Sequence, residues 1–367
     1  MSNFSYLKLK AIFSSEAEKF GNQIMAEEAV ESADFCAENI TEEDIVSQAD
    51  KETENITEED IVSLANKETG EFEIDFCFEG GLHNTNWETC TKNSGHTDFF
   101  PIDEFTIDKL PDNVRDKDTY GLIKALSELT VHITVGYASP DRPSKVNDKD
   151  YPCFSAKNRW TPRYGSGRVW GAEKVENEPC QCSDCKTSDN PIKQWAKISI
   201  LTAMHVIFDQ SEAEKSKFKL GFNKDGDNYK TLEGYKAFKC DLKEDMCYLY
   251  SASHRVDLVD ELKKHLEEFE EKCRVVNAKY KKTDNVKLTA IVSHPHGYFK
   301  RVTVGNWEVQ EPQKNKSTRY EYTTATCKGS SGAPVFVFGK EKGWWLTHHH
   351  SGCDKNTKFN YSGIIWL

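Results

Sequence analysis

The sequence of 367 residues lacks any long apolar run, and this absence excludes one class of protein. No stretch approaches the roughly 18 apolar residues that a helix needs to cross a bilayer. The amino-terminal Met1–Lys10 has only a short apolar patch before acidic residues follow, whereas a secretory signal has a longer apolar core. We therefore expect a cytoplasmic protein without a membrane span.

The chain also lacks an excess of positive charge. It has 48 Lys+Arg against 60 Asp+Glu, a formal net charge of −12, which argues against a polyanionic partner. The balance is uneven, because residues 1–70 hold 17 acidic and 5 basic side chains and the remainder is formally neutral. No nucleic-acid motif is present in that remainder. The expected partner is a protein or peptide substrate, and the oligomeric state stays open.

The first 70 residues contain a tandem duplication. Residues 38–53 and 54–69 are two nearly identical 16-residue units rich in Glu and Asp. Two units are too few for a solenoid. The pattern predicts an acidic arm over 1–70 that is partly helical or disordered, with a specific docking module as the alternative. Residues 71–120 mix aromatic and turn residues and predict no clear element, so they are assigned as a linker or extension.

From residue 121 onwards, short β-rich runs predict a mostly β domain over 121–367. Glycine, proline, asparagine and aspartate separate the runs, as in an antiparallel barrel or sandwich. The five clearest runs are residues 131–135, 167–170, 197–201, 286–292 and 334–338. One segment differs, because residues 256–279 place apolar side chains at helical spacing between charges. This predicts an amphipathic helix inserted into the β-domain and packed on it.

Three segments together suggest nucleophilic catalysis. A β-branched strand ends in Leu201-Thr-Ala-Met-His205, Asp245 opens an apolar strand, and Gly329-Ser-Ser331-Gly-Ala-Pro leads into another strand. A serine hydroxyl becomes nucleophilic when a neutral imidazole accepts its proton, and a buried carboxylate orients that imidazole. The amides of Gly329 and Ser331 can then converge on an oxyanion.

The His-Asp-Ser order resembles that of trypsin/chymotrypsin-fold serine peptidases, the PA clan, over residues 120–367. Their hallmarks are Thr-Ala-Ala-His, an Asp-Ile-Ala-Leu-type strand and Gly-Asp-Ser-Gly-Gly-Pro. The resemblance implies a chymotrypsin-like double β-barrel of two perpendicular six-stranded barrels. It places His205 and Asp245 on the first barrel and Ser331 on the second. Asp241 and Glu244 lie near Asp245, but only Asp245 directly precedes an apolar run.

The sequence departs from the trypsin-like pattern in three places. Met204 replaces the second alanine of Thr-Ala-Ala-His. No cysteine follows His205, so the disulfide usual beside that histidine is absent. Ser330 replaces the acid that pairs with a new amino terminus after zymogen cleavage, so activation by that ion pair is not expected. The Gly-Ser-Ser-Gly-Ala-Pro motif is closer in style to glutamyl-endopeptidase-like, HtrA-like and viral branches.

The resemblance also indicates a specificity pocket. Thr326 lies five residues before Ser331, and a later strand contains His348 and His350 on one face by strand alternation. In glutamyl endopeptidases and picornavirus-type proteases, a Thr or Ser and a His at these places line the pocket, and those enzymes cut after Glu or Gln. We therefore expect Glu or Gln before the cut. The alternative is that the three histidines form a polar strand or a chance metal cluster.

Cysteine spacing suggests a metal site. Cys180, Cys182 and Cys185 lie within six residues of a polar loop and predict structural zinc with a fourth ligand such as Cys153 or Cys240. Only one C-x-x-C unit is present, so free thiols remain the alternative.

Other cysteines and histidines near the motifs have structural interpretations. Cys327 and Cys353 stand where relatives often form a disulfide, which a reducing cytosol opposes. His294 and His296 are interpreted as structural, because His205 already fills the role of base.

The predicted function is a serine endopeptidase that needs no cofactor for its chemistry. The main alternative is a catalytically inactive, protease-like module that binds peptides or protein partners. A third possibility is a zinc-stabilised interaction protein dominated by the cysteine loop and the acidic arm. We also hypothesise that the Glu-rich repeats of residues 1–70 act as a pseudo-substrate for a Glu-preferring pocket.

Overall fold

The computed structural model describes residues 71–76, 87–146, 148–281, 286–312, 317–340 and 347–366. Every element below belongs to the unit Thr57–Leu367. The predicted acidic arm of residues 1–70 lies outside the described residues.

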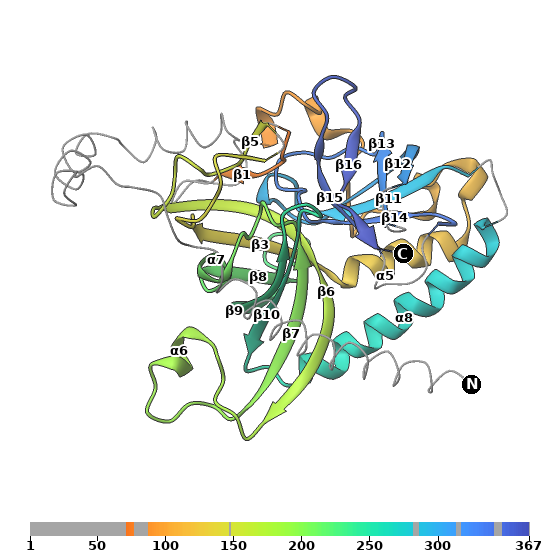
Figure 1. The fold of residues 1–367 in the computed structure, drawn as a ribbon. Helices are drawn as coiled ribbons and strands as arrows, with labels where there is room; N and C mark the ends of the chain where they lie inside the picture. Colours follow the sequence, from red (N-terminus) through yellow and green to blue (C-terminus); the bar gives the residue numbers. More distant parts are fainter. Residues whose placement is uncertain are drawn as a thin grey trace, which may run out of the picture. The chain divides into compact units, whose positions relative to one another are not determined.

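The first sheet closes into a six-stranded antiparallel barrel in the order β6-β3-β8-β9-β10-β7, because β7 also pairs with β6 (Figure 1). Alternation explains β3, in which Val131, Ile133 and Val135 are completely buried on one face. The predicted strands over 131–135, 167–170 and 197–201 are confirmed. The six strands are β3 (Thr130–Tyr137), β6 (Trp160–Glu176), β7 (Gln194–Thr202), β8 (Ser216–Leu220), β9 (Lys230–Asp241) and β10 (Met246–Ser253).

The second sheet also closes, in the order β13-β16-β15-β14-β11-β12, with β12 returning to β13. Its strands are β11 (Leu288–Ser293), β12 (Arg301–Pro312), β13 (Ser317–Tyr322), β14 (Pro334–Val337), β15 (His348–Cys353) and β16 (Asn360–Ser362). Short strands β2 (Phe100–Pro101) and β17 (Ile365–Trp366) extend it, and β4 (Lys145–Val146) pairs with β5 (Lys149–Asp150). The predicted mostly β, chymotrypsin-like double barrel is confirmed.

Two long helices lie together beside the barrels. The predicted amphipathic helix is confirmed as α8 (Asp257–Tyr280), whose apolar side is buried and packs on α5 (Lys117–Glu128) and on β6 (Figure 1). Asp116 caps α5 by accepting hydrogen bonds from the amides of Asp118 and Thr119, and its carboxylate also accepts one from the Tyr280 hydroxyl at 2.6 Å. These bonds attach the end of α8 to the start of α5.

Further helices among the described residues are short, each of three or four residues. They are α6 (Ser183–Lys186), α7 (Gln210–Ala213), η1 (Ser94–His96), η2 (Ile107–Lys109), η3 (Asp112–Val114) and η4 (Pro295–Gly297). Among the described residues, no helix combines the length and the hydrophobicity needed to cross a membrane.

The stretch 71–120, in which the sequence predicts no clear element, joins both barrels. Its strand β1 (Asp75–Phe76) pairs with β6 of the first barrel, and β2 pairs with β12 of the second. Helix α5 begins within the same stretch. The ordered body therefore starts well before residue 121.

Candidate functional site

His205 and Asp245 meet because the strands next to them pair. His205 follows β7 by three residues, Asp245 directly precedes β10, and the register pairs Thr202 with Cys247. The two oxygens of Asp245 lie 2.7 and 2.9 Å from Nδ1 of His205, and one of them also accepts the His205 amide at 3.1 Å. This geometry places the proton of a neutral imidazole on Nδ1 and leaves Nε2 able to accept another.

Two residues of β15 hold Asp245 from the other side. The hydroxyl of Ser351 donates to the Asp245 carboxylate, and Nε2 of His349 donates to the Asp245 main-chain carbonyl at 2.7 Å. Burial by itself would raise the pKa of Asp245, but the nearby His205 outweighs it and the pKa is lowered. His205 thus favours the ionised form of Asp245, whose side chain is largely but not completely buried.

Ser331 lies at the junction of the two barrels. Its carbonyl accepts the amide of Ser166 in β6 at 2.8 Å, and Gly332 beside it has φ +82°. A Cβ on Gly332 would stand 2.2 Å from the Ser166 carbonyl oxygen, so only glycine permits this approach. Among the described residues, neither Oγ of Ser331 nor Nε2 of His205 has a hydrogen-bond partner, although both atoms are buried.

Ser330, the residue before the predicted nucleophile, is held by hydrogen bonds to neutral groups. The hydroxyl of Ser330 lies 3.2 Å from the hydroxyl of Ser293 and accepts the amide of Cys327 at 3.2 Å. The loop that contains Ser331 is therefore fixed at Ser330 by neutral hydrogen bonds.

The amide of Gly329 contacts a peptide carbonyl from a distant part of the chain. Gly329 has φ +87°, and its N–H donates to the main-chain oxygen of Glu73 at 2.7 Å. This amide is one of the two predicted for the oxyanion hole, and it points at a carbonyl oxygen. The corresponding role of the Ser331 amide stays a prediction.

The segment Glu71–Phe76 runs past the His-Asp-Ser constellation. The carbonyl of Glu71 accepts a hydrogen bond from the amide of Cys353 at 2.9 Å. Phe72 forms an antiparallel bridge with Gly352, which lies in β15. The Phe72 ring lies against the His205 ring, with centroids 4.6 Å apart. The segment thus adds to the edge of β15 as an extra short strand.

The side chain of Glu73 enters the predicted pocket. Its carboxylate lies 2.6 Å from Nε2 of His350, whose Nδ1 lies 2.7 Å from the Tyr322 hydroxyl. Burial lowers the pKa of His350, which favours a neutral ring that donates from Nε2 and accepts from Tyr322. Burial would raise the pKa of Glu73, but Lys92 and His350 lower it well below its usual range.

Lys92 is a pocket residue that the sequence did not indicate. Its ammonium forms an ion pair with Glu73 and donates to Oγ1 of Thr326 at 3.1 Å and to the side-chain oxygen of Asn360 at 2.7 Å. Thr326 and Glu73 thus share Lys92 as a partner, and a pocket role for Thr326 stays a prediction. Nε2 of His348 lies 3.1 Å from Oγ1 of Thr318, and a pocket role for His348 stays a prediction.

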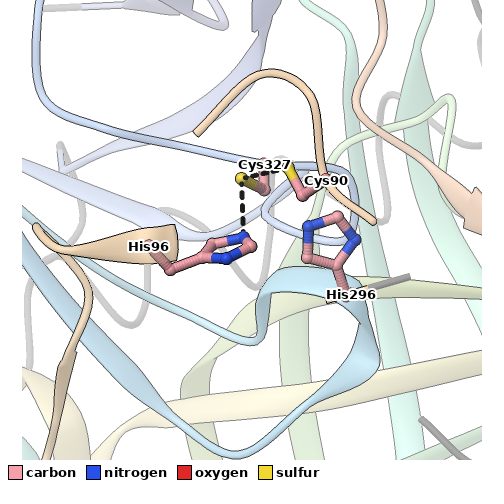
Figure 2. Close-up of side chains that lie close together, drawn as sticks. All are labelled: Cys90, His96, His296 and Cys327. Carbon is pink, nitrogen blue, oxygen red and sulfur yellow. Dashed lines mark hydrogen bonds between the residues drawn. The ribbon is translucent and has the colours of Figure 1, made fainter. Parts of the chain in front are cut away.

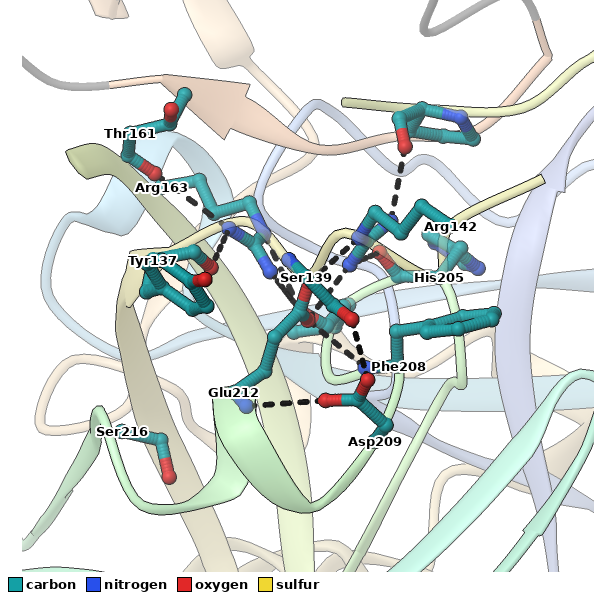
Figure 3. A network of polar contacts seen from close by, with 12 residues as sticks. Tyr137, Ser139, Arg142, Thr161, Arg163, His205, Phe208, Asp209, Glu212 and Ser216 are labelled. Carbon is teal, nitrogen blue, oxygen red and sulfur yellow. Dashed lines mark hydrogen bonds and ion pairs between the residues drawn. The ribbon is translucent and has the colours of Figure 1, made fainter. Parts of the chain in front are cut away.

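A buried charge network supports the loop that contains His205 (Figure 3). Glu212 forms ion pairs of 2.6 Å with Arg142 and with Arg163, and all three side chains are fully buried. Arg142 donates to the carbonyl of His205 at 3.1 Å, and Arg163 donates to the carbonyl of Val206 at 3.1 Å. Burial would raise the pKa of Glu212, but the two arginines lower it to about 2.

The three clustered cysteines have a histidine as their fourth neighbour. The ligand atoms of Cys180, Cys182, Cys185 and His254 all lie within 4.8 Å of one another. Nε2 of His254 is 3.2 Å from the Cys182 sulfur and 3.4 Å from the Cys185 sulfur. This Cys3His set matches a structural zinc site.

The fourth ligands that the sequence suggested lie elsewhere. Cys153 is buried in a small apolar cluster with Ile74 and Phe76, and the sulfur of Cys240 lies 2.7 Å from that of Cys247. Cys327 and Cys353 are both free thiols. His254 follows β10 by one residue, and no spacing rule connects it to the cysteine loop.

Comparison with known proteins finds similarity in structure only. No protein-family model matches the chain, and no curated protein matches it. Similar solved structures include Deg5 (12% identity, TM-score 0.35, 69% of this chain and 90% of that one) and the HtrA-type protease AlgW with a tripeptide (9%, 0.36, 68% and 60%). A third is the active form of the Rv3671c protease from M. tuberculosis (11%, 0.32, 66% and 78%). Similarity at this level does not identify the residues that act in this chain.

Proposed function

We propose that the protein is a serine endopeptidase. The observation that supports this proposal is the arrangement at the junction of the two barrels, where Asp245 orients His205. The Ser331 hydroxyl has no hydrogen-bond partner among the described residues, and two residues before it the Gly329 amide donates to the carbonyl of Glu73. Ser331 is the nucleophile, His205 the general base and then the general acid, and Asp245 the residue that orients the imidazole.

The proton movements follow from the hydrogen bonds around His205. Because Asp245 accepts from Nδ1, the lone pair on Nε2 is available to take the Ser331 proton as Oγ attacks a carbonyl carbon. The Gly329 amide donates to the oxygen on which negative charge develops. Nε2 then returns the proton to the leaving amine, and water hydrolyses the acyl-enzyme by the same route in reverse order. No metal is needed at the reacting atoms.

The pocket favours glutamate before the cut. His350 donates a hydrogen bond to a carboxylate oxygen, and Lys92 adds a positive charge beside it. A glutamine amide can accept from His350 but gains no charge attraction from Lys92, whereas an apolar side chain would leave the Nε2 donor of His350 unpaired. Glutamate is therefore preferred over glutamine.

We assign a structural role to the cluster of Cys180, Cys182, Cys185 and His254. Zinc bound there would cross-link the loop between β6 and β7 to the end of β10, at a distance from the nucleophile loop in the fold (Figure 1). Its contribution would be to stability and not to the reaction.

The test uses the full chain, a fluorophosphonate probe and a peptide library. Labelling of wild type that is lost in Ser331→Ala, together with cuts after Glu, supports the proposal. Well-folded protein that is neither labelled nor active would identify a peptide-binding module instead. Cuts after Arg or Phe would reject the assigned pocket while leaving the triad in place.

A further inference from the structure

We propose that the chain is its own substrate and hydrolyses the peptide bond between Glu73 and Ile74. The inference rests on the proposed endopeptidase function and names a substrate for that site. Its basis is the segment Glu71–Phe76, which pairs with the second barrel before the Glu73–Ile74 bond and with the first barrel after it. The carbonyl of this bond accepts a hydrogen bond from the Gly329 amide.

The residues before the bond are bound as a peptide strand. The Glu71 carbonyl accepts from the Cys353 amide, Phe72 bridges to Gly352 and contacts the His205 ring, and the Glu73 side chain fills the pocket of His350. Main-chain hydrogen bonds supply affinity in such strand addition, and a side-chain pocket supplies register. The register puts Glu73, and not Glu71, at the cut.

The other acid of the segment is accounted for separately. The Glu71 carboxylate lies 2.6 Å from the ammonium of Lys149 and accepts from the Tyr361 hydroxyl at 3.4 Å, outside the pocket. Glu71 and Glu73 are therefore a matched pair, with the same side chain in two different environments.

The residues after the bond are held by the first barrel. Asp75 pairs with Tyr164 and Phe76 with Arg163 in β6, and the buried Ile74 packs with Phe76 in a small apolar cluster. With both flanks fixed, the scissile carbonyl has little freedom to leave the Gly329 amide. Holding reactants in this manner makes an attack effectively unimolecular.

The reaction is a hydrolysis that balances with one water. Oγ of Ser331 bonds to the Glu73 carbonyl carbon as His205 takes its proton, and the C–N bond to Ile74 breaks as Nε2 gives that proton to the Ile74 nitrogen. Water then attacks the Glu73–Ser331 ester with His205 as base. The products are residues 1–73 with a carboxylate on Glu73, and residues 74–367 with an amine on Ile74.

The experiment follows purified full-length chain over time by intact mass and amino-terminal sequencing. Wild type is expected to give a new amino terminus at Ile74 at a rate that does not change over a hundred-fold dilution. Ser331→Ala should stay intact. Glu73→Ala should lose at least ten-fold in rate, while the matched Glu71→Ala should still be cut after Glu73.

The outcomes separate this inference from the proposed function. A wild-type chain that stays intact while Ser331 of the Glu73→Ala chain is labelled by the fluorophosphonate probe would overturn self-cleavage and leave the endopeptidase in place. That result would identify the segment as an uncleaved inhibitor. Loss of labelling in both chains would reject the endopeptidase itself. Cutting at a site other than Glu73–Ile74 would also overturn the inference.

We further infer a second metal site, formed by Cys90, His96, His296 and Cys327, from an independent observation (Figure 2). Their ligand atoms lie within 4.8 Å of one another, and three of the four residues are buried. The two sulfurs are 3.6 Å apart, and the Cys327 sulfur is 3.5 Å from Nε2 of His96. Tetrahedral zinc with its usual bond lengths would separate two sulfur ligands by about 3.8 Å.

The surroundings of His296 support a metal ligand. Its Nδ1 lies 2.8 Å from the Asp75 carboxylate, whereas its buried Nε2 has no hydrogen-bond partner among the described residues. A carboxylate on one nitrogen fixes the tautomer that presents the other nitrogen to a metal. Trp87 also stacks on His96, with centroids 3.7 Å apart. A Cys2His2 set of this kind is typical of structural zinc.

The test measures zinc per chain in purified full-length protein by mass spectrometry under native conditions. Cys182→Ser removes the first cluster, so one bound zinc is expected to remain in that variant and to be lost on adding Cys90→Ser. In the Cys182→Ser variant, replacement by cobalt should give a thiolate-to-cobalt absorption band that disappears when Cys90→Ser is added. Cys182→Ser protein that holds no zinc and gives no such band would overturn this site.

Discussion

Nε2 of His350 lies 2.6 Å from a carboxylate oxygen of Glu73, although 277 positions separate the two residues. Only the fold brings them together, since Glu73 precedes both barrels and His350 lies in β15. His350 is a predicted pocket residue, and Glu73 is the residue that we propose lies directly before the cleaved bond.

The first prediction concerns His350. His350→Ala should lower kcat/KM for peptides with Glu before the cut by roughly 10- to 150-fold, because a hydrogen bond to a charged group contributes about 1.5–3 kcal/mol. Peptide kinetics on the full chain measure this change. His265→Ala on α8 is the control and should leave kcat/KM within two-fold. An unchanged preference in His350→Ala would place the pocket elsewhere.

The second prediction separates glutamate from glutamine. Lys92→Met should reduce kcat/KM about ten-fold or more for Glu peptides and far less for matched Gln peptides, because only the carboxylate attracts the ammonium. The ratio of the two values is the readout. A variant that lost activity equally on both peptides would indicate that Lys92 supports the loop and does not read charge.

The third prediction tests the acid of the triad. Asp245→Asn should lower kcat by on the order of 10⁴, because an amide no longer holds the His205 proton on Nδ1. Asp241→Asn is the matched control, since the Asp241 side chain caps only its own turn through the amides of Lys243 and Glu244. Its kcat should change less than two-fold. If the Asp241 variant were inactive and the Asp245 variant active, Asp241 and not Asp245 would be the acid that orients His205.

The fourth prediction concerns the buried pair of arginines around Glu212. Glu212→Gln should destabilise the fold by about 3–5 kcal/mol, since it leaves two buried guanidinium groups without their counter-charge. The exposed Glu214→Gln should stay within about 0.5 kcal/mol of wild type. Urea unfolding at neutral pH measures both values.

The same carboxylate predicts how stability depends on pH. The pKa of Glu212 is lowered from 4.5 to about 2 in the folded chain, so its contribution is fully present above pH 4.5 and is lost as the pH falls towards 2. In wild type the free energy of unfolding should therefore decrease over this window. The decrease should be smaller in Glu212→Gln, and an equal decrease would show that other acids cause it.

Local motifs predicted much of the first barrel and indicated two residues, His205 and Asp245, that its strands bring into contact. Thr-Ala-Met-His205 ends a strand, Asp245 opens one, and both assignments depend on short-range pattern alone. The helix ending at Tyr280 was equally visible, because its apolar spacing runs through six turns. Helix α5 was not predicted, because only Leu129 separates it from β3 and its apolar residues were not distinguished from those of the strand.

Residues that act through distant contacts could not be predicted. Lys92 has no motif around it, and its position beside Thr326 depends on how residues 87–96 lie against the second barrel. His254 joins the cysteine loop only because β10 ends beside it. No motif marks Arg142 or Arg163, yet both are completely buried and form ion pairs with Glu212.

A cut after Glu73 would divide the chain close to the boundary between its acidic and its nearly neutral part. Residues 1–70 hold 17 acidic and 5 basic side chains, so hydrolysis after Glu73 would separate a polyanion from a body whose charges nearly cancel. Molecules near their isoelectric point repel one another weakly and associate more readily. One broken bond would then alter the colloidal behaviour of the barrels as well as the access of other peptides to Ser331.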